Sequence, residues 1–143
     1  MGSVRPLAGY EEVPHTADWA LRVWAPDLPS LFQQAAAGMY ALAGVVLAAD
    51  AHLERDLTLT ASDAETLLVA FLSELLYVAE QERLAFDHLT LTIVAGPQKY
   101  VLQAHLRGAA IRSLAKMIKA VTFHNLKIRS LEQGLETEII FDV

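Results

Sequence analysis

The sequence contains no cysteine. This absence excludes disulfide bonds, thiolate ligands for zinc and cysteine nucleophiles, and it is compatible with a reducing compartment. No apolar run approaches the roughly 20 residues that a membrane-spanning helix needs. Residues 1–10 have neither the basic segment nor the apolar segment of a secretory signal peptide. We therefore expect a soluble protein of the cytoplasm.

The familiar motifs of self-contained enzymes are also missing. There is no glycine-rich loop of the P-loop or dinucleotide type and no Gly-x-Ser-x-Gly elbow. The five histidines do not form the His-x-x-x-His pair of zinc proteases. We therefore expect a protein that is not an enzyme by itself, and we keep a metal-dependent hydrolase as an alternative.

The composition is that of a globular domain, with 54% hydrophobic and 20% charged residues in a chain of 143. The formal net charge is −6, which argues against tight, direct RNA binding by this chain alone. Basic residues nevertheless concentrate late in the sequence, as a solvated face or as a surface for nucleic acid. They are Arg107, Arg112, Lys116, Lys119, Lys127 and Arg129.

Two stretches have the periodicity of amphipathic helices. The first covers about residues 30–44 and opens with a serine and a glutamine in the spacing of a capping box. The second covers about residues 62–81 and opens with a serine and a glutamate in the same spacing. Residues 110–120 are ambiguous, because their apolar positions fit a strand as well as a third helix.

Alternation with a period of two predicts strands in much of the remaining chain, at residues 19–24, 55–60, 89–93, 100–107 and 137–143. Gly96-Pro97 predicts a hairpin, and a change of phase predicts a bulge or turn near Asn125. These elements indicate an α+β fold, a mostly antiparallel or mixed sheet packed with two to three helices. We expect one such domain over residues 10–143, after a flexible tail of residues 1–9.

The tetrapeptide His15-Thr16-Ala17-Asp18 is the first of three candidate functional motifs. It brings an imidazole, a hydroxyl and a carboxylate together just before a predicted strand. An aspartate at a strand start can accept main-chain hydrogen bonds in a turn. The motif is therefore either a turn that begins the strand or a site.

The other two motifs lie at the end of the sequence. In KMIKAVTFHNL, the polar residues Lys119, Thr122 and His124 either belong to an ordinary half-buried strand or serve a function. In EIIFDV, Asp142 alternates with apolar residues and Val143 carries the terminal carboxylate. A frayed end is the structural alternative for this last motif.

The first and third motifs have complementary chemistry. Calcium, magnesium and manganese prefer oxygen ligands, which two carboxylates and main-chain or terminal oxygens can supply. If the strand after Asp18 lies beside the last strand, Asp18 and Asp142 could face each other. The two carboxylates would then repel unless a cation or a basic group such as Lys119 lay between them.

Three blocks of the sequence together resemble the archease family. They are HTADWALRVWAPDLPSLFQQAAAGMYAL, LLVAFLSELLYVAEQERLAF and the terminal signature IKAVTFHNLKI…IIFDV. The resemblance implies a small α+β protein that is a cofactor of the GTP-dependent RNA ligase of tRNA splicing or RNA repair. That ligase joins a 3′-phosphate or 2′,3′-cyclic phosphate to a 5′-hydroxyl. The cofactor would help it form its guanylate intermediate and turn over repeatedly.

The resemblance also implies site residues. Asp18, Asp142 and an oxygen of Val143 would bind a divalent cation, while His15, Lys119 and His124 match motif positions of supporting role. Glu74, in the second helix, is either a functional acid near this site or a carboxylate on the helix flank. The rival class of function is a general chaperone or interaction module without metal dependence, with exposed apolar surface around Trp19, Trp24 and Tyr77.

The sequence departs from the family pattern in three places. Met117 stands where an acidic residue is common in relatives, and the usual Gly-Glu before the basic segment is not evident in HLRGAAIRS. Pro14 precedes His15 where a less constrained residue is common. These departures concern the surface that would face the ligase more than the metal ligands.

Overall fold

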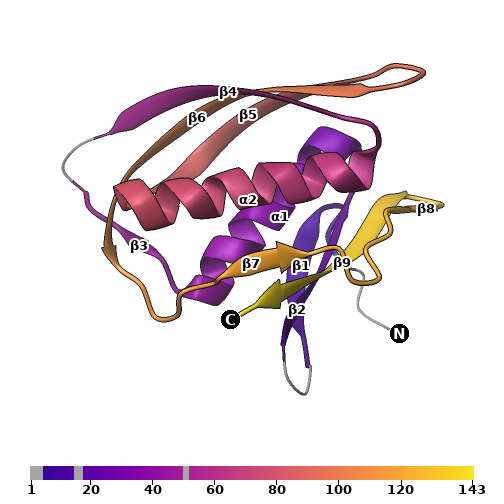
Figure 1. The fold of residues 1–143 in the computed structure, drawn as a ribbon. Coiled ribbons are helices and arrows are strands. Elements are labelled where there is room, and N and C mark those ends of the chain that lie inside the picture. The colour runs from indigo at the N-terminus through magenta and orange to yellow at the C-terminus, as the bar shows by residue number, and fades with distance from the viewer. Residues whose placement is uncertain (1–4, 15–17, 50–51) are drawn as a thin grey trace.

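The computed structural model describes residues 5–14, 18–49 and 52–143, which form two helices and nine strands (Figure 1). The helices are α1 (Leu28–Ala43) and α2 (Ala64–Glu82). The strands are β1 (Gly9–Val13), β2 (Trp19–Ala25), β3 (Val46–Leu47), β4 (Leu53–Ala61), β5 (Leu84–Ala95), β6 (Tyr100–Ser113), β7 (Ala120–Thr122), β8 (Arg129–Leu131) and β9 (Gly134–Asp142). This architecture confirms the predicted α+β class.

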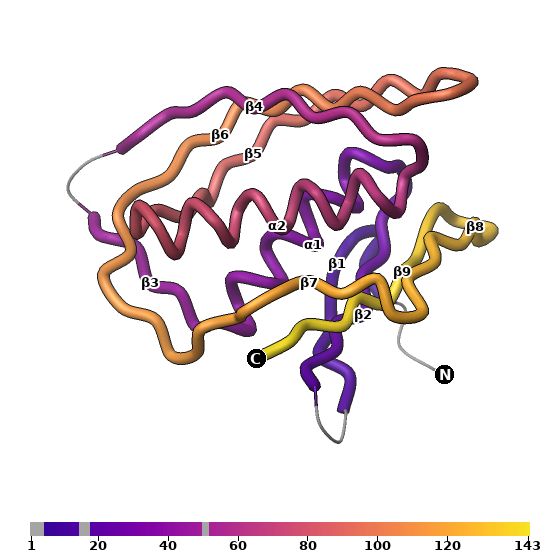
Figure 2. The backbone as a smooth tube through the Cα atoms, viewed as in Figure 1, coloured from indigo at the N-terminus to yellow at the C-terminus, as the bar shows by residue number. Residues whose placement is uncertain are grey.

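The strands make two sheets, and every pairing between described strands is antiparallel. The first sheet has the order β1-β2-β9-β7, with β8 also paired to β9. In the second sheet, β6 pairs with β3, β4 and β5. Both helices lie between the sheets, as Figures 1 and 2 show, and α2 contacts β4 of one sheet and β7 of the other.

The core consists of the apolar faces of both helices and the inner faces of both sheets. Phe32 of α1 and Phe71 of α2 are fully buried, and their ring centroids lie 5.7 Å apart. Leu21 and Phe141 close the core from the first sheet, and Leu102 closes it from the second. Burying each such side chain contributes about 1.5–3 kcal/mol relative to exposure, so this three-layer packing holds both sheets in place.

Both helices begin at an aspartate, and the predicted capping boxes are wrong. Asp27 Oδ1 accepts a hydrogen bond of 2.9 Å from the main-chain nitrogen of Ser30, which therefore lies inside the first turn. Asp63 Oδ1 likewise accepts from the nitrogen of Thr66 at 2.7 Å. A carboxylate at this position stabilises the positive end of the helix dipole as well as an unpaired amide.

The glutamate of the second predicted capping box has a tertiary partner instead. Glu65 Oε2 accepts a hydrogen bond of 3.0 Å from the main-chain nitrogen of Ile128. The contact ties the segment between β7 and β8 to the start of α2. The C-terminus of α1 is capped by Gly44, as predicted. The φ of Gly44 is 66°, a left-handed conformation that glycine adopts without strain.

The ambiguous stretch of residues 110–120 does not form a helix. Its first part continues β6 as far as Ser113, and its last residue begins β7. The predicted turn near Asn125 is confirmed, because Asn125 has a φ of 54° and the nitrogen of Leu126 donates to the oxygen of Phe123. The expected strand alternation up to His124 is wrong, since β7 ends at Thr122.

The flexibility expected for residues 1–9 stays a prediction, because residues 1–4 lie outside the described residues. The described part of this segment is packed on β2. The indole nitrogen of Trp24 donates to the main-chain oxygen of Pro6 at 2.8 Å, and the guanidinium of Arg5 lies 4.4 Å from the centroid of its ring. Within the described residues, neither helix is long and apolar enough to cross a membrane.

Candidate functional site

The strand after the first motif lies beside the last strand. β2 and β9 pair in the register Trp19↔Phe141, and this register continued by one residue brings Asp18 opposite Asp142. Trp19 and Phe141 face the helices and the core. Because successive side chains of a strand alternate between faces, Asp142 lies on the opposite face, which we call the outer face of the first sheet. The same alternation, continued by one residue before the start of β2, puts Asp18 on this face too.

The main chain at Asp142 is held on its other side by the second motif. Ala120 of β7 pairs with Asp142, and the main-chain nitrogen of Lys119 donates to the oxygen of Asp142 at 2.8 Å. The side chain of Lys119 is exposed. Val143 follows with its side chain packed against the core. The structure thus brings together Asp18, Lys119, Asp142 and Val143 at one end of the first sheet.

The donor set at this end suits a hard cation. Two carboxylates on one row repel each other, and within the described residues no basic side chain forms an ion pair with either of them. Nor do three histidine, aspartate or glutamate side chains gather as a complete metal cage within residues 5–14, 18–49 and 52–143. Asp18 and Asp142 could supply two ligands, and main-chain oxygens and water would have to complete the shell.

The other predicted site residues lie in different positions. His15 falls outside the described residues. His124 is exposed in the turn after β7, where its ring nitrogen Nε2 lies 3.3 Å from the side-chain nitrogen Nδ2 of Asn125. Glu74 is half-buried on α2, near enough to Arg55 of β4 that its charge contributes to raising the pKa of that guanidinium, after the larger effect of Glu82. This influence on Arg55 indicates that Glu74 lies on the side of α2 near the second sheet, which carries neither Asp18 nor Asp142.

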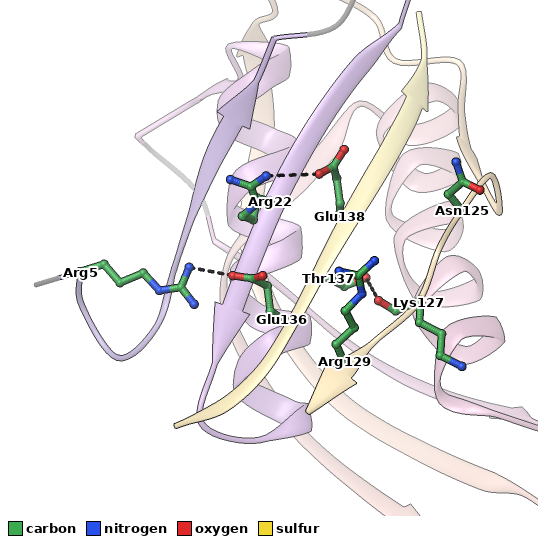
Figure 3. A pocket seen from close by; sticks show the side chains of 8 residues that line it. All are labelled: Arg5, Arg22, Asn125, Lys127, Arg129, Glu136, Thr137 and Glu138. Atoms are coloured by element: carbon green, nitrogen blue, oxygen red, sulfur yellow. Dashed lines mark hydrogen bonds and ion pairs between the residues drawn. The ribbon is translucent and has the colours of Figure 1, made fainter. Parts of the chain in front are cut away.

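A second charged region on the outer face was not predicted from the sequence. A pocket of about 240 Å³ lies over β2, β8 and β9 and includes three arginines, Arg5, Arg22 and Arg129 (Figure 3). Two glutamates of β9, Glu136 and Glu138, also line it. The late cluster of basic residues pointed to Arg129, but Arg5 and Arg22 are remote in sequence, and no local pattern joins them to it.

Comparison with known proteins identifies the class to which this small α+β domain belongs. The model of the Archease protein family (MTH1598/TM1083) matches residues 10–143. Protein archease of Pyrococcus furiosus is 30% identical over 129 residues, covering 87% of this chain and 91% of that protein. Protein archease of Methanosarcina mazei is 27% identical over 146 residues, covering 94% and 95%. The chain therefore belongs to the archease family, which confirms the resemblance seen in its motifs.

Two solved structures are similar to this one. The solution structure of protein 1598 of Methanobacterium thermoautotrophicum matches with a TM-score of 0.76 and 27% identity, covering 94% of this chain and 99% of that chain. The crystal structure of an archease, possible chaperone, from Thermotoga maritima matches with a TM-score of 0.65 and 19% identity, covering 100% and 99%. The second likeness, at this low identity, concerns the fold alone.

Proposed function

We propose that this protein is a metal-binding activator of a GTP-dependent RNA ligase that joins a 3′-phosphate or 2′,3′-cyclic phosphate to a 5′-hydroxyl. The activator would promote guanylylation of the ligase and repeated turnover, in tRNA splicing or in RNA repair, and it would act in the cytoplasm. The observation that supports the proposal is the register Trp19↔Phe141 in a chain of the archease family, since its continuation by one residue would bring Asp18 opposite Asp142. The ligase supplies the catalytic nucleophile, so the protein itself is not an enzyme in this proposal.

In this mechanism Asp18, Asp142 and an oxygen of Val143 hold a divalent cation, which could be calcium, manganese or magnesium. The cation would supply positive charge to phosphate oxygens, the main requirement of phosphoryl transfer. The sheet performs the positioning: β2 and β7 flank β9 on both sides, so Asp142 is presented from a central strand and Asp18 from the residue directly before β2. Lys119 and His124 are exposed beside β7 and would contact the ligase rather than the cation.

The proposal is tested by multiple-turnover ligation. The protein, at a small fraction of the substrate concentration, is mixed with its ligase, GTP, manganese and RNA ends bearing 3′-phosphate and 5′-hydroxyl. We expect the parent protein to stimulate ligation and Asp18→Asn and Asp142→Asn to reduce the rate to that of ligase alone. Asp87→Asn is the matched control, because Asp87 is exposed on β5 of the second sheet. Folded Asp18→Asn protein that stimulates as well as the parent would refute the proposal.

The alternative function is that of a general chaperone, and one observation favours it. Tyr77 and Phe123 are exposed by 59% and 57% of their surface. The apolar surface that this alternative requires does not include Trp24, which is only 7% exposed. Trp19 is half-buried, and the ammonium of Lys116 lies 5.5 Å from the centroid of its ring. Suppression of light scattering by an aggregating client, lost in Tyr77→Ser and Phe123→Ser but unaffected by chelator, would support this alternative.

A further inference from the structure

The arginine pocket is built from segments that are distant in the sequence. Arg5 precedes β1, Arg22 lies on β2, and Arg129 lies on β8, while Glu136 and Glu138 lie on β9 between them. Figure 3 shows these side chains on the outer face of the first sheet, with the helices behind it. Arg22 lies on β2, four residues after Asp18, which directly precedes this strand. At about 3.3 Å per residue, the pocket begins about 13 Å from the aspartate pair.

Two of the three guanidinium groups are held in place by carboxylates. Arg5 Nη1 lies 2.7 Å from Glu136 Oε2. Arg22 Nη1 lies 3.0 Å from Glu11 Oε1 of β1, and its Nη2 lies 3.5 Å from Glu138 Oε2. These contacts use part of the five N–H donors of each guanidinium and restrict its orientation. The remaining donors stay available at the pocket.

The third guanidinium lacks a carboxylate partner among the described residues. Arg129 is directly opposite Glu136 in the pairing of β8 with β9. Glu136 is nevertheless bound by Arg5, and no ion pair joins Arg129 to any described carboxylate. Figure 3 shows its guanidinium directed over β9, whereas the ammonium of Lys127 points away from the pocket. Arg129 therefore brings an uncompensated positive charge to the outer face of a protein whose net charge is −6.

We propose that this pocket binds a phosphate group through Arg129, with Arg22 and the side-chain amide of Asn125 as further donors. The three residues approach from β8, from β2 and from the turn after β7. A tetrahedral phosphate accepts hydrogen bonds from several directions at once, and guanidinium groups bind it bidentately. A planar carboxylate offers two oxygens and suits such an arrangement less well. The phosphate belongs to a nucleotide or to an RNA end, and binding is weak and salt-dependent.

The test uses the isolated protein, without ligase and with EDTA present, so that a cation at Asp18 and Asp142 plays no part. Titration calorimetry would compare pyrophosphate, GTP and a short single-stranded RNA with a 3′-phosphate, with an acidic peptide as the competing class. We expect Arg129→Gln to weaken phosphate binding about tenfold or more, since it removes a charge-assisted contact. Arg107→Gln is the matched control, because Arg107 is exposed on β6 of the second sheet.

Each outcome decides the proposal. Binding of GTP or RNA that Arg129→Gln weakens and Arg107→Gln does not would support it, and the tighter of the two ligands identifies the source of the phosphate. Equal binding by both variants, binding of the acidic peptide alone, or no binding at millimolar phosphate would overturn it. If Arg129→Gln fails to fold, Arg129→Lys replaces it in the same comparison, because lysine keeps the positive charge but lacks the planar guanidinium that binds phosphate bidentately. Because no ligase and no metal are present, failure here leaves the proposed activation untouched.

Discussion

The main-chain oxygen of Asp142 accepts a hydrogen bond of 2.8 Å from the main-chain nitrogen of Lys119. This bond and the pairing of Ala120 with Asp142 hold the end of β9 through the backbone alone. The exposed side chain of Asp142 is not needed for the ladder. Substitutions at this carboxylate can therefore separate cation binding from folding.

We expect Asp142→Asn to change the free energy of unfolding by no more than about 0.5 kcal/mol, as is usual for exposed positions. The same change should weaken calcium or manganese binding about tenfold or more, because the number of charged oxygen ligands sets the affinity of such sites. Calorimetric titration of the isolated protein with each ion measures the affinity. Unchanged affinity in Asp142→Asn, with Asp87→Asn as control, would contradict the proposed ligand role.

The aspartate caps give a second prediction. Asp27→Ala and Asp63→Ala should each lower the free energy of unfolding by about 1 kcal/mol, because each leaves a helix amide unsatisfied. Ser62→Ala should change it by less than about 0.5 kcal/mol, since the structure places the cap at Asp63 rather than at Ser62. Urea denaturation followed by circular dichroism compares the variants. A larger loss in Ser62→Ala than in Asp63→Ala would restore the capping box predicted from the sequence.

Lowering the pH should reduce the stability that the N-cap residue Asp63 contributes. The hydrogen bond from the main-chain nitrogen of Thr66 lowers the pKa of Asp63 below its usual value of 3.8. A carboxyl group whose pKa is lower in the folded state stabilises the protein above its unfolded pKa, and this contribution is lost as the pH falls through the folded pKa. The stability difference between parent and Asp63→Ala should therefore shrink below about pH 4.

His105 provides the opposite pH dependence. Its Nδ1 lies 2.7 Å from Asp56 Oδ1 and its Nε2 lies 2.9 Å from Glu54 Oε1, across the pairing of β4 with β6. The contact with Asp56, followed by that with Glu54, raises the pKa of His105 above 6.5. Any stabilisation from this raised pKa is complete below the unfolded value and disappears as the pH rises through the folded value.

NMR titration of the His105 ring measures this effect directly. We expect the pKa of His105 in the folded protein to lie above that of a histidine in a short unstructured peptide. In Asp56→Asn we expect this pKa to fall. Asp87→Asn, on the neighbouring strand, should leave it unchanged, since Asp87 contacts His88 and not His105. A pKa of His105 that does not respond to Asp56→Asn would contradict the contact.

Two phenylalanines should respond very differently to the same substitution. Phe71 is fully buried against Phe32, whereas Phe123 is 57% exposed after β7. Phe71→Ala should cost about 3–5 kcal/mol of stability, because it removes buried apolar area and leaves a cavity. Phe123→Ala should change stability by no more than about 0.5 kcal/mol. Chemical denaturation checks both values, and a large loss in Phe123→Ala would show that this side chain packs in solution.

The periodicity of the sequence predicted both helices and the long strands well, because hydrophobic patterning is a local property. It predicted the wrong N-caps because each helix start offers two residues that can cap it, a serine and an aspartate. The side chains of both aspartates, at residues 27 and 63, accept a hydrogen bond from the main-chain amide three residues later. The predicted capping boxes, which begin at a serine, therefore do not form. The apolar positions of residues 110–113 fitted the period of a helix and that of a strand equally well. These residues form a strand because they pair with β3 and β5.

For the candidate site, too, some features follow from the sequence and others only from the tertiary structure. The sequence by itself placed Asp18 directly before a predicted strand and showed that Asp142 alternates with apolar residues, since a strand presents every second side chain to the same face. Only the tertiary structure decided that β2 lies beside β9 in the register Trp19↔Phe141, which, continued by one residue, brings these two carboxylates opposite each other. The pairing of β9 with both β2 and β8, and the contact of Arg5 with Glu136, likewise assembled Arg5, Arg22 and Arg129 around one pocket. Contacts between such distant residues depend on how the sheet and the core pack together, which no local pattern of residues encodes.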